Sequence, residues 1–151
     1  MFAPKKILVP TDFSEFSDKA LADAVDIARQ YDSTIYLLHV VGIMRMCASD
    51  YCMSADTLED MRKETIKFAR DTMGQQIEKT GKTDGIKIIT DVREGVPTYA
   101  EILEEQKEKG VDLIVIASHG KTGIIEHLMG SVADRVTRHA TCPVYLVRPR
   151  K

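Results

Sequence analysis

The sequence predicts a single α/β domain, a doubly wound, five-stranded parallel sheet with helices on both faces. Three observations lead to this fold class. Short apolar runs rich in β-branched residues recur along the chain, as in strands that are buried on both faces. Segments with apolar residues at helical spacing separate these runs. The alternation of strand and helix favours parallel pairing through right-handed crossovers.

The first half of the chain predicts a β-α-β unit followed by a loop and a long helix. A strand at residues 7–10 ends at Pro10, and Ser14 is the expected N-cap of a helix that ends at Asp32. A second strand follows at residues 34–41. Residues 42–54 have no regular period and predict a loop. Residues 57–79 then predict a helix long enough to project beyond the sheet.

The second half continues the alternation. A turn at residues 81–85 precedes a strand at 86–92, and Gly95-Val96-Pro97 opens the next helix. The unbroken apolar run at residues 113–117 predicts a strand that is buried on both faces and begins at Asp112. The last helix is expected to begin at Ser131, and the last strand runs from Pro143 to Val147.

Bulk composition limits the class of function. The chain has 151 residues, of which 44% are hydrophobic and 29% charged, as expected for one globular domain. A net charge of −2 disfavours nucleic-acid binding driven by phosphate neutralisation. No apolar run reaches the roughly 20 residues of a membrane helix, and the first residues lack a signal-peptide core. We therefore expect a cytoplasmic protein without a membrane partner. The three cysteines do not indicate a disulfide framework.

Two short turns have the character of a phosphate site. Ser118-His119-Gly120 follows the strand predicted at residues 112–117, and Gly130-Ser131 lies where the last helix begins. Glycine lets the backbone approach a ligand closely, and a helix N-terminus presents unpaired N–H groups with partial positive charge. Ligands of doubly wound sheets bind where the strand order reverses. We therefore expect the first and fourth strands to be neighbours, with Thr11 and Asp12 facing the same crevice.

Three segments resemble the universal stress protein family: KKILVPTDFSEFSDKAL, YLLHVV and ASHGKTGIIEHLMGSVADRVTRHATCPVYLV. The ATP-binding branch of that family has the pattern G-x-x-G-x9-G-[ST]. Gly120, Gly130 and Ser131 match it, but Ala117 stands where the first glycine belongs. An added methyl group there is expected to crowd a ribose or an α-phosphate, so Ala117→Gly should tighten nucleotide binding by about 1–3 kcal/mol.

The resemblance implies an adenine-nucleotide site with roles for individual positions. Asp12 would lie against the adenosine, and the backbone of Val40 would read the adenine edge. Gly120 and Gly130 would cradle the phosphates, and Ser131, as the helix cap, would donate to the β- or γ-phosphate. The expected ligand is ATP with Mg²⁺. The full expected set is Pro10, Thr11, Asp12, Val40, Ala117, His119, Gly120, Gly130, Ser131 and Val132.

Other interpretations stay open from sequence. Asp12 is alternatively a brace of its turn, and Ser131 alternatively an N-cap and nothing more. For His119 we expect a structural role. Cys47 and Cys52, with nearby methionines, leave open a soft-metal site or a redox disulfide beside a variable surface loop.

The leading function is an ATP-binding regulatory protein of the stress response with little or no hydrolysis. The alternative is the same fold with a vestigial site, acting as a dimeric interaction module through an unknown protein partner. An enzyme is disfavoured because the chain has neither the G-x-x-x-x-G-K-[ST] phosphate loop nor a dinucleotide fingerprint.

A homodimer through the final strand is also expected. The segment from Pro143 to Val147 is apolar and uncharged, and in a doubly wound order it lies at a sheet edge, which proteins normally cover or pair. Members of the resembled family tend to dimerise through this strand. The rival expectation is that the long helix at residues 57–79 covers the edge and keeps the protein monomeric.

Overall fold

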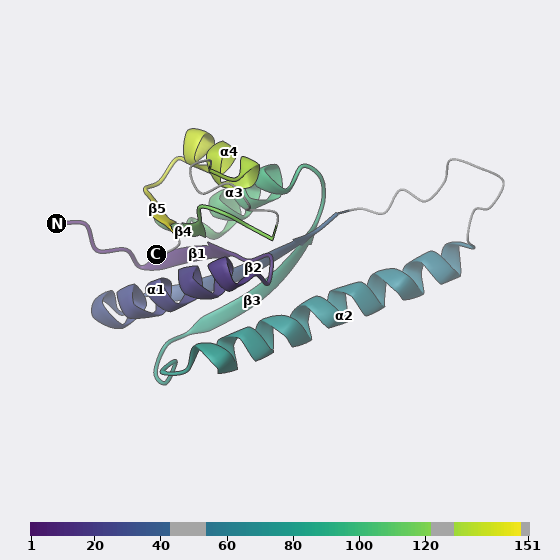
Figure 1. Ribbon diagram of the computed structural model, residues 1–151, viewed down its shortest axis with the longest axis horizontal. Helices are drawn as coiled ribbons and strands as arrows, with labels where there is room; N and C mark the ends of the chain where they lie inside the picture. Colours follow the sequence, from purple (N-terminus) through teal and green to yellow (C-terminus); the bar gives the residue numbers. More distant parts are fainter. Residues whose placement is uncertain (43–53, 122–128, 149–151) are drawn as a thin grey trace.

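The computed structural model describes residues 1–42, 54–121 and 129–148, and it confirms the predicted sheet (Figure 1). Five strands pair in the order β3-β2-β1-β4-β5, and every neighbouring pair is parallel. The strand order reverses between β1 and β4, as expected. The strands are β1 (Lys6–Pro10), β2 (Thr34–Val41), β3 (Ile88–Glu94), β4 (Leu113–Ala117) and β5 (Val144–Val147).

Helices cover both faces of the sheet. Helices α1 and α2 lie on one face and α3 and α4 on the other (Figure 1). Ser14 caps α1 as predicted, since its side chain accepts a hydrogen bond from the Ser17 N–H, and Asp32 ends the helix. The helices are α1 (Glu15–Tyr31), α2 (Ala55–Thr80), α3 (Thr98–Lys109) and α4 (Ser131–His139).

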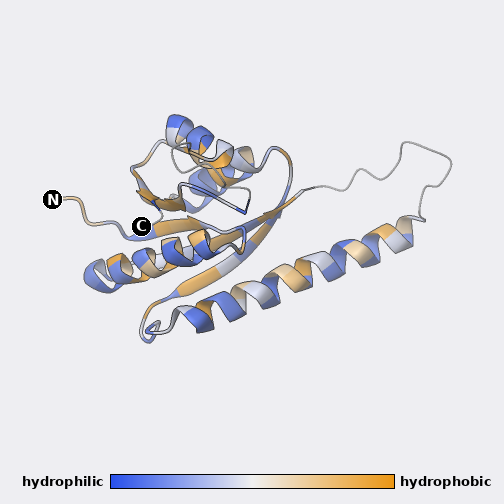
Figure 2. Ribbon diagram, in the orientation of Figure 1, coloured by the Kyte–Doolittle hydropathy of each residue, from blue (hydrophilic) through white to orange (hydrophobic). Residues whose placement is uncertain are grey.

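Two apolar clusters form the core, one on each side of the sheet. Alternate residues of the central strands point to opposite faces, so Ile7 and Val9 pack beneath α1 while Leu8 packs beneath α3 and α4. All three are completely buried. We call these clusters the α1-side core and the α3/α4-side core. The apolar colouring of the strands and the mixed colouring of the helices follow this arrangement (Figure 2).

The predicted boundaries of the third strand are wrong by two residues. The prediction was 86–92, whereas β3 spans Ile88–Glu94. The Ile86 N–H still belongs to the preceding turn, because it donates to the Thr83 carbonyl at 3.0 Å. At the other end β3 pairs with β2 residue by residue as far as Glu94, which lies opposite Val41. The apolar pattern ended too early because backbone pairing continues through charged residues at a sheet edge.

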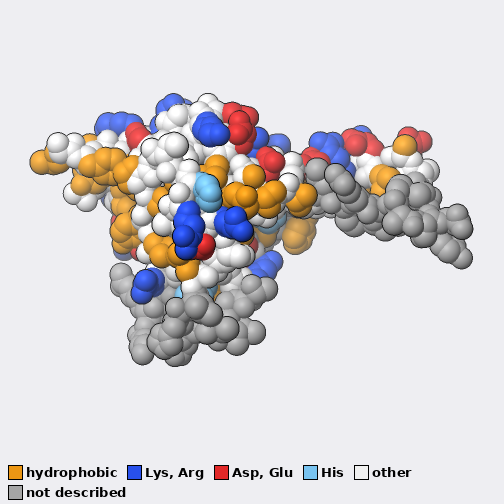
Figure 3. All heavy atoms as spheres, turned by 90° about the horizontal axis from the view of Figure 1, so that it is seen from above, with side chains coloured by type: hydrophobic (Ala, Val, Ile, Leu, Met, Phe, Trp, Pro, Cys, Tyr) orange, Lys and Arg blue, Asp and Glu red, His pale blue; other side chains and the backbone are white. Residues whose placement is uncertain are grey.

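Helix α2 projects beyond the sheet, as its length predicted. Its side chains at Ala69, Met73 and Gln76 are buried, whereas Phe68 is 68% exposed. Acidic and basic side chains alternate along the projecting part (Figure 3). The helix packs against β2 and β3, at the opposite edge of the sheet from β5, so the rival expectation that it covers the last strand is wrong.

Cys47 and Cys52 lie outside the described residues, as does the rest of the predicted loop at residues 43–53. The other predicted boundaries agree with the structure to within two residues. None of the described helices combines the length and apolarity that a bilayer span requires.

Candidate functional site

A cavity of about 360 Å³ opens at the carboxyl edge of the sheet, where β1 and β4 diverge. Its size falls in the range of small-molecule sites, and its position is where doubly wound folds bind ligands. All ten residues predicted from sequence line it. The cavity also takes in residues that were not assigned a ligand role: Ser17, Leu38, His39, Thr98, Ile102, Ile116, Ser118, Lys121 and Ala133.

The apolar part of the cavity is formed by one end of the α3/α4-side core. Leu38, Ile102, Ile116 and Ala133 belong to that cluster, and Val40 packs against it. Their sequence pattern is that of core residues, and sequence gives no sign that the same side chains also line a cavity. A flat apolar ligand group is suited to this wall.

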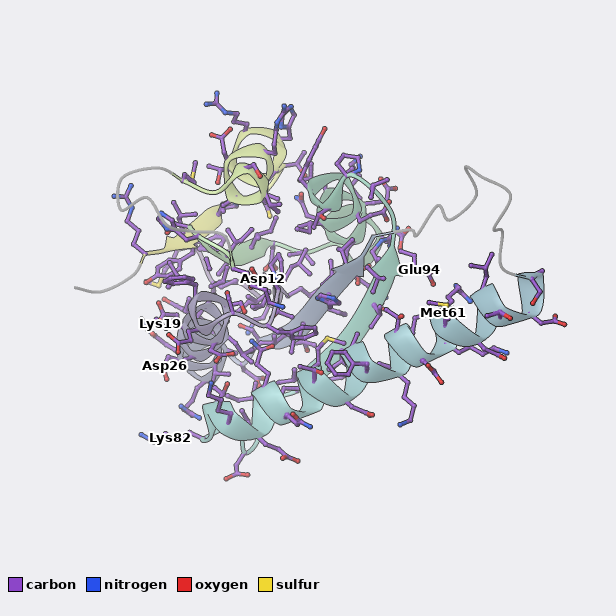
Figure 4. The ribbon with its side chains drawn as sticks, turned by 45° about the vertical axis from the view of Figure 1, so that its right-hand side comes forward. Asp12, Lys19, Asp26, Met61, Lys82 and Glu94 are labelled. Carbon is purple, nitrogen blue, oxygen red and sulfur yellow. The ribbon has the colours of Figure 1, made fainter. Side chains whose placement is uncertain are left out.

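Asp12 ties together the two turns at the mouth of the cavity. Its Oδ1 accepts hydrogen bonds from the Ser14 N–H at 3.0 Å and the Ser14 hydroxyl at 2.5 Å, and its Oδ2 accepts from the Lys121 N–H at 2.9 Å. Burial disfavours ionisation, but these hydrogen bonds outweigh it and lower the pKa of Asp12 below its ordinary value. The carboxylate therefore braces the turn, and it lies between β1 and the start of α1 (Figure 4).

His39 holds the turn after β1 from the side of β2. Its Nδ1 lies 2.8 Å from the Thr11 carbonyl, which can only accept, so Nδ1 carries the proton. The ring stacks on Phe13 with 4.2 Å between centroids. Burial lowers the pKa of His39, so the ring is neutral at neutral pH. His39 is therefore a hydrogen-bonded part of the cavity wall.

A side chain would clash at Gly120 and would be tightly crowded at Gly130. A Cβ at Gly120 would lie 2.5 Å from Asp12 Oδ2, and a Cβ at Gly130 would lie 3.3 Å from the Ser118 carbonyl oxygen. The Gly130 N–H donates to that same carbonyl at 2.7 Å. Gly120 therefore lets the turn after β4 approach Asp12 in the turn after β1, and Gly130 lets the start of α4 approach the turn after β4.

Ser131 does not cap the last helix. Gly130 is the N-cap, in an extended conformation, and Ser131 is the first helical residue; among the described residues no side-chain hydrogen bond caps the helix. The predicted cap is wrong by one position. The Gly130 N–H donates to the Ser118 carbonyl, which holds Gly130 outside the helix, and the Gly130 carbonyl accepts the first helical hydrogen bond, from the Asp134 N–H. The first N–H groups of α4, from Ser131 onward, therefore have no intrahelical partner and lie at the cavity.

Ala117 occupies the position of the missing glycine, yet its side chain belongs to the α1-side core. Ile116, next to it on β4, belongs to the α3/α4-side core that forms the apolar wall of the cavity. Alternation along the strand thus turns the Ala117 methyl group away from that wall. This packing argues against the crowding expected from sequence.

The remaining polar residues of the turn after β4 support its shape. The Ser118 hydroxyl lies 2.7 Å from His119 Nδ1, and Ser118 is only 2% exposed, which favours a structural role for this pair over a nucleophilic one. Lys121 was not predicted. Its Nζ lies 5.9 Å from the centroid of the Phe13 ring, at the edge of the cavity. Within residues 1–42, 54–121 and 129–148, no three His, Cys, Asp or Glu side chains are grouped to hold a metal ion.

Comparison with known proteins agrees with this fold. The model of the universal stress protein family matches residues 4–148. Universal stress protein MJ0531 of Methanocaldococcus jannaschii is 37% identical over 147 residues, covering 97% of this chain and 84% of that protein. Universal stress protein YxiE of Bacillus subtilis is 34% identical over 147 residues, covering 95% and 98%. The solved structure of the protein MJ0577 superposes with a TM-score of 0.82 at 28% identity over 99% of both chains. This chain belongs to the universal stress protein family.

Proposed function

We propose that this protein binds ATP in the cavity between β1 and β4 and acts as a nucleotide-dependent regulatory protein. The observation that carries the proposal is the pair Gly120 and Gly130, each in a position where a Cβ would meet its neighbour, beside the uncapped N-terminus of α4. The two glycines leave room for a ligand to approach the first backbone N–H groups of α4, which have no intrahelical partner. A phosphate requires such an arrangement.

The two ends of the cavity suit the two ends of the ligand. The N–H groups that begin with Ser131 and the ammonium group of Lys121 offer positive charge for the phosphates. The apolar wall that includes Val40 suits a base, and the carboxylate of Asp12 retains lone pairs that a ribose hydroxyl would donate to. Mg²⁺ would accompany the phosphates of the nucleotide rather than occupy a carboxylate cage of the protein.

We expect little or no hydrolysis. A general base needs a pKa near the working pH, whereas hydrogen bonding lowers the pKa of Asp12 and makes it a weak base. Burial lowers the pKa of His39 as well, which makes its neutral ring a weaker base. These groups hold the cavity in shape and are poorly suited to activating water.

Titration calorimetry on nucleotide-stripped protein tests the proposal. ATP should bind with one site per chain, and GTP should bind more weakly, because the backbone of Val40 is expected to read the adenine edge. A protein that is folded but releases no heat with ATP or GTP would contradict nucleotide binding and favour a vestigial site.

Ala117→Gly tests whether the Ala117 methyl group crowds the ligand, as the sequence predicts, or packs away from it, as in the structure. Because the methyl group packs in the α1-side core, we expect ATP affinity to change by less than about twofold. The same change should cost about 0.5–1 kcal/mol of the free energy of unfolding, since glycine loses more backbone entropy and leaves a gap. Calorimetry and thermal melting measure the two effects, and a tenfold gain in affinity would show that the methyl group obstructs the ligand.

A further inference from the structure

Gln76 connects the long helix α2 to the cavity. Three residues of α2 are buried, and Gln76, at 5% exposed, is the polar one among them. Its side-chain oxygen Oε1 lies 3.0 Å from the hydroxyl of Thr11, a residue that lines the cavity. Its nitrogen Nε2 lies 2.8 Å from Asp18 Oδ1 on α1. One side chain thus joins α2, α1 and the turn after β1.

Chemistry fixes the direction of the two hydrogen bonds of the Gln76 amide to Asp18 and Thr11. A carboxylate only accepts, so the amide nitrogen of Gln76 faces Asp18 and its oxygen faces Thr11. The Thr11 hydroxyl has one proton and lies 3.0 Å from two acceptors, Gln76 Oε1 and Ser17 Oγ. Its oxygen accepts from the Phe13 N–H, at 3.1 Å. Gln76 and Ser17 together orient the group that holds Phe13.

Phe13 needs that support because its backbone is strained. Its φ is 64°, in the left-handed region that aromatic residues rarely adopt. Such a conformation persists only where neighbouring groups over-determine it. Here the bonds from the Phe13 N–H to Thr11 and from the Ser14 N–H to Asp12 hold the turn, and both acceptor residues line the cavity.

We propose that Gln76 is a positioning residue through which the docking of α2 sets the ligand affinity of the cavity. The proposal rests on the proposed nucleotide binding. When α2 is docked, the Thr11 hydroxyl is oriented and the strained turn is held ready for the ligand. When the contact is lost, the turn relaxes, and ligand binding must first restore it, which lowers the apparent affinity. By linkage, bound ligand favours the docked position of α2 in return.

Gln76→Met tests the contact against a matched control. Methionine keeps the length of the side chain but removes both polar atoms, so we expect ATP binding to weaken by about tenfold or more. Gln75→Met makes the same change at the preceding residue, which is exposed, and should leave the affinity unchanged. Both affinities come from calorimetry, with thermal melting to confirm that each protein is folded.

Gln76→Glu adds a readout that lost packing would not produce. A protonated carboxyl group at this position repeats the amide pattern, because its O–H donates to Asp18 while its carbonyl oxygen accepts from Thr11. Once ionised, it faces the Asp18 carboxylate, whose other oxygen lies 2.7 Å from Lys79 Nζ. Burial and the Asp18 charge raise the pKa of the introduced group, so ATP affinity relative to wild type should fall as pH rises through about 5–8. The ATP affinity of Gln75→Glu relative to wild type should not change with pH.

The outcomes separate the two proposals. If wild-type protein does not bind ATP, the proposed function is overturned, and the role of Gln76 with it. If the wild type binds and folded Gln76→Met binds equally well, only the role of Gln76 is overturned. The affinity of Gln76→Glu relative to wild type is followed as a trend across pH, so it decides the question even if Gln76→Met fails to fold; a ratio that does not change with pH would overturn the positioning role.

Discussion

Gly130→Val is expected to abolish ATP binding while leaving the protein folded. The backbone of Gly130 has φ −60° and ψ 148°, which valine adopts readily, so the effect comes from space and not from strain. A Cβ there already lies 3.3 Å from the Ser118 carbonyl, and the two branches of valine would fill the gap in front of the α4 N–H groups. We expect affinity to fall by more than about 100-fold, beyond the effect of one misplaced methyl group.

The control for this variant is Gly74→Val. A Cβ at Gly74, on α2, meets no atom within 4 Å, so the same side chain enters open space. Calorimetry should give wild-type affinity for this control, and thermal melting should show both variants folded. Equal ATP affinity of Gly130→Val and wild type would remove the phosphate role assigned to the start of α4.

Tyr145→Lys is expected to convert a dimer into folded monomers. The structure places β5 at a sheet edge, where it pairs with β4 on one side only within the described chain, and a homodimer through this edge remains our proposal. Val144 and Leu146 pack against the α3/α4-side core, so a charge at either position would also damage the fold. Tyr145 is 46% exposed and is therefore the better place to introduce one.

The surroundings of Tyr145 suit a two-fold contact. It lines a groove between α1 and β5 together with charged residues of both signs, among them Lys19 and Asp26 on the outer side of α1 (Figure 4). In a two-fold contact each residue pair occurs twice, so a surface with charges of both signs would be able to pair with itself. Light scattering should give about twice the chain mass of 16.9 kDa for wild type and the single mass for Tyr145→Lys. Phe68→Lys, at an exposed aromatic residue on α2, should remain dimeric. A wild-type mass of one chain at high concentration would rule the dimer out.

The fold was predictable because its signals are local. Buried strands such as β4 have an unbroken apolar sequence, and the glycines of the turn after β4 mark a close approach of backbone whatever the ligand. The end of β3 at Glu94 was not predictable from hydropathy, because pairing with β2 and not side-chain polarity decides where that strand stops. The one-position error at Ser131 has a similar origin, in a hydrogen bond between residues distant in sequence.

The polar half of the candidate site was predictable and the apolar half was not. Residues such as Gly120 and Asp12 stand out against their surroundings, whereas Ile102 and Ile116 match ordinary core positions and line the cavity only because the sheet ends above them. Gln76 gave no signal for a further reason. A glutamine in a charged helix resembles any solvated residue until the packing of α2 on α1 buries it.

Backbone amide NMR during an ATP titration tests the proposed nucleotide site most directly, because it reports both whether ATP binds and which residues it contacts. We expect the largest chemical-shift changes at Thr11, Gly120, Gly130 and Ser131, with smaller ones at Val40. The projecting part of α2 near Met61, which lies away from Asp12 (Figure 4), should change little. Shifts confined to α2, or no shifts at millimolar ATP, would contradict a nucleotide site between β1 and β4.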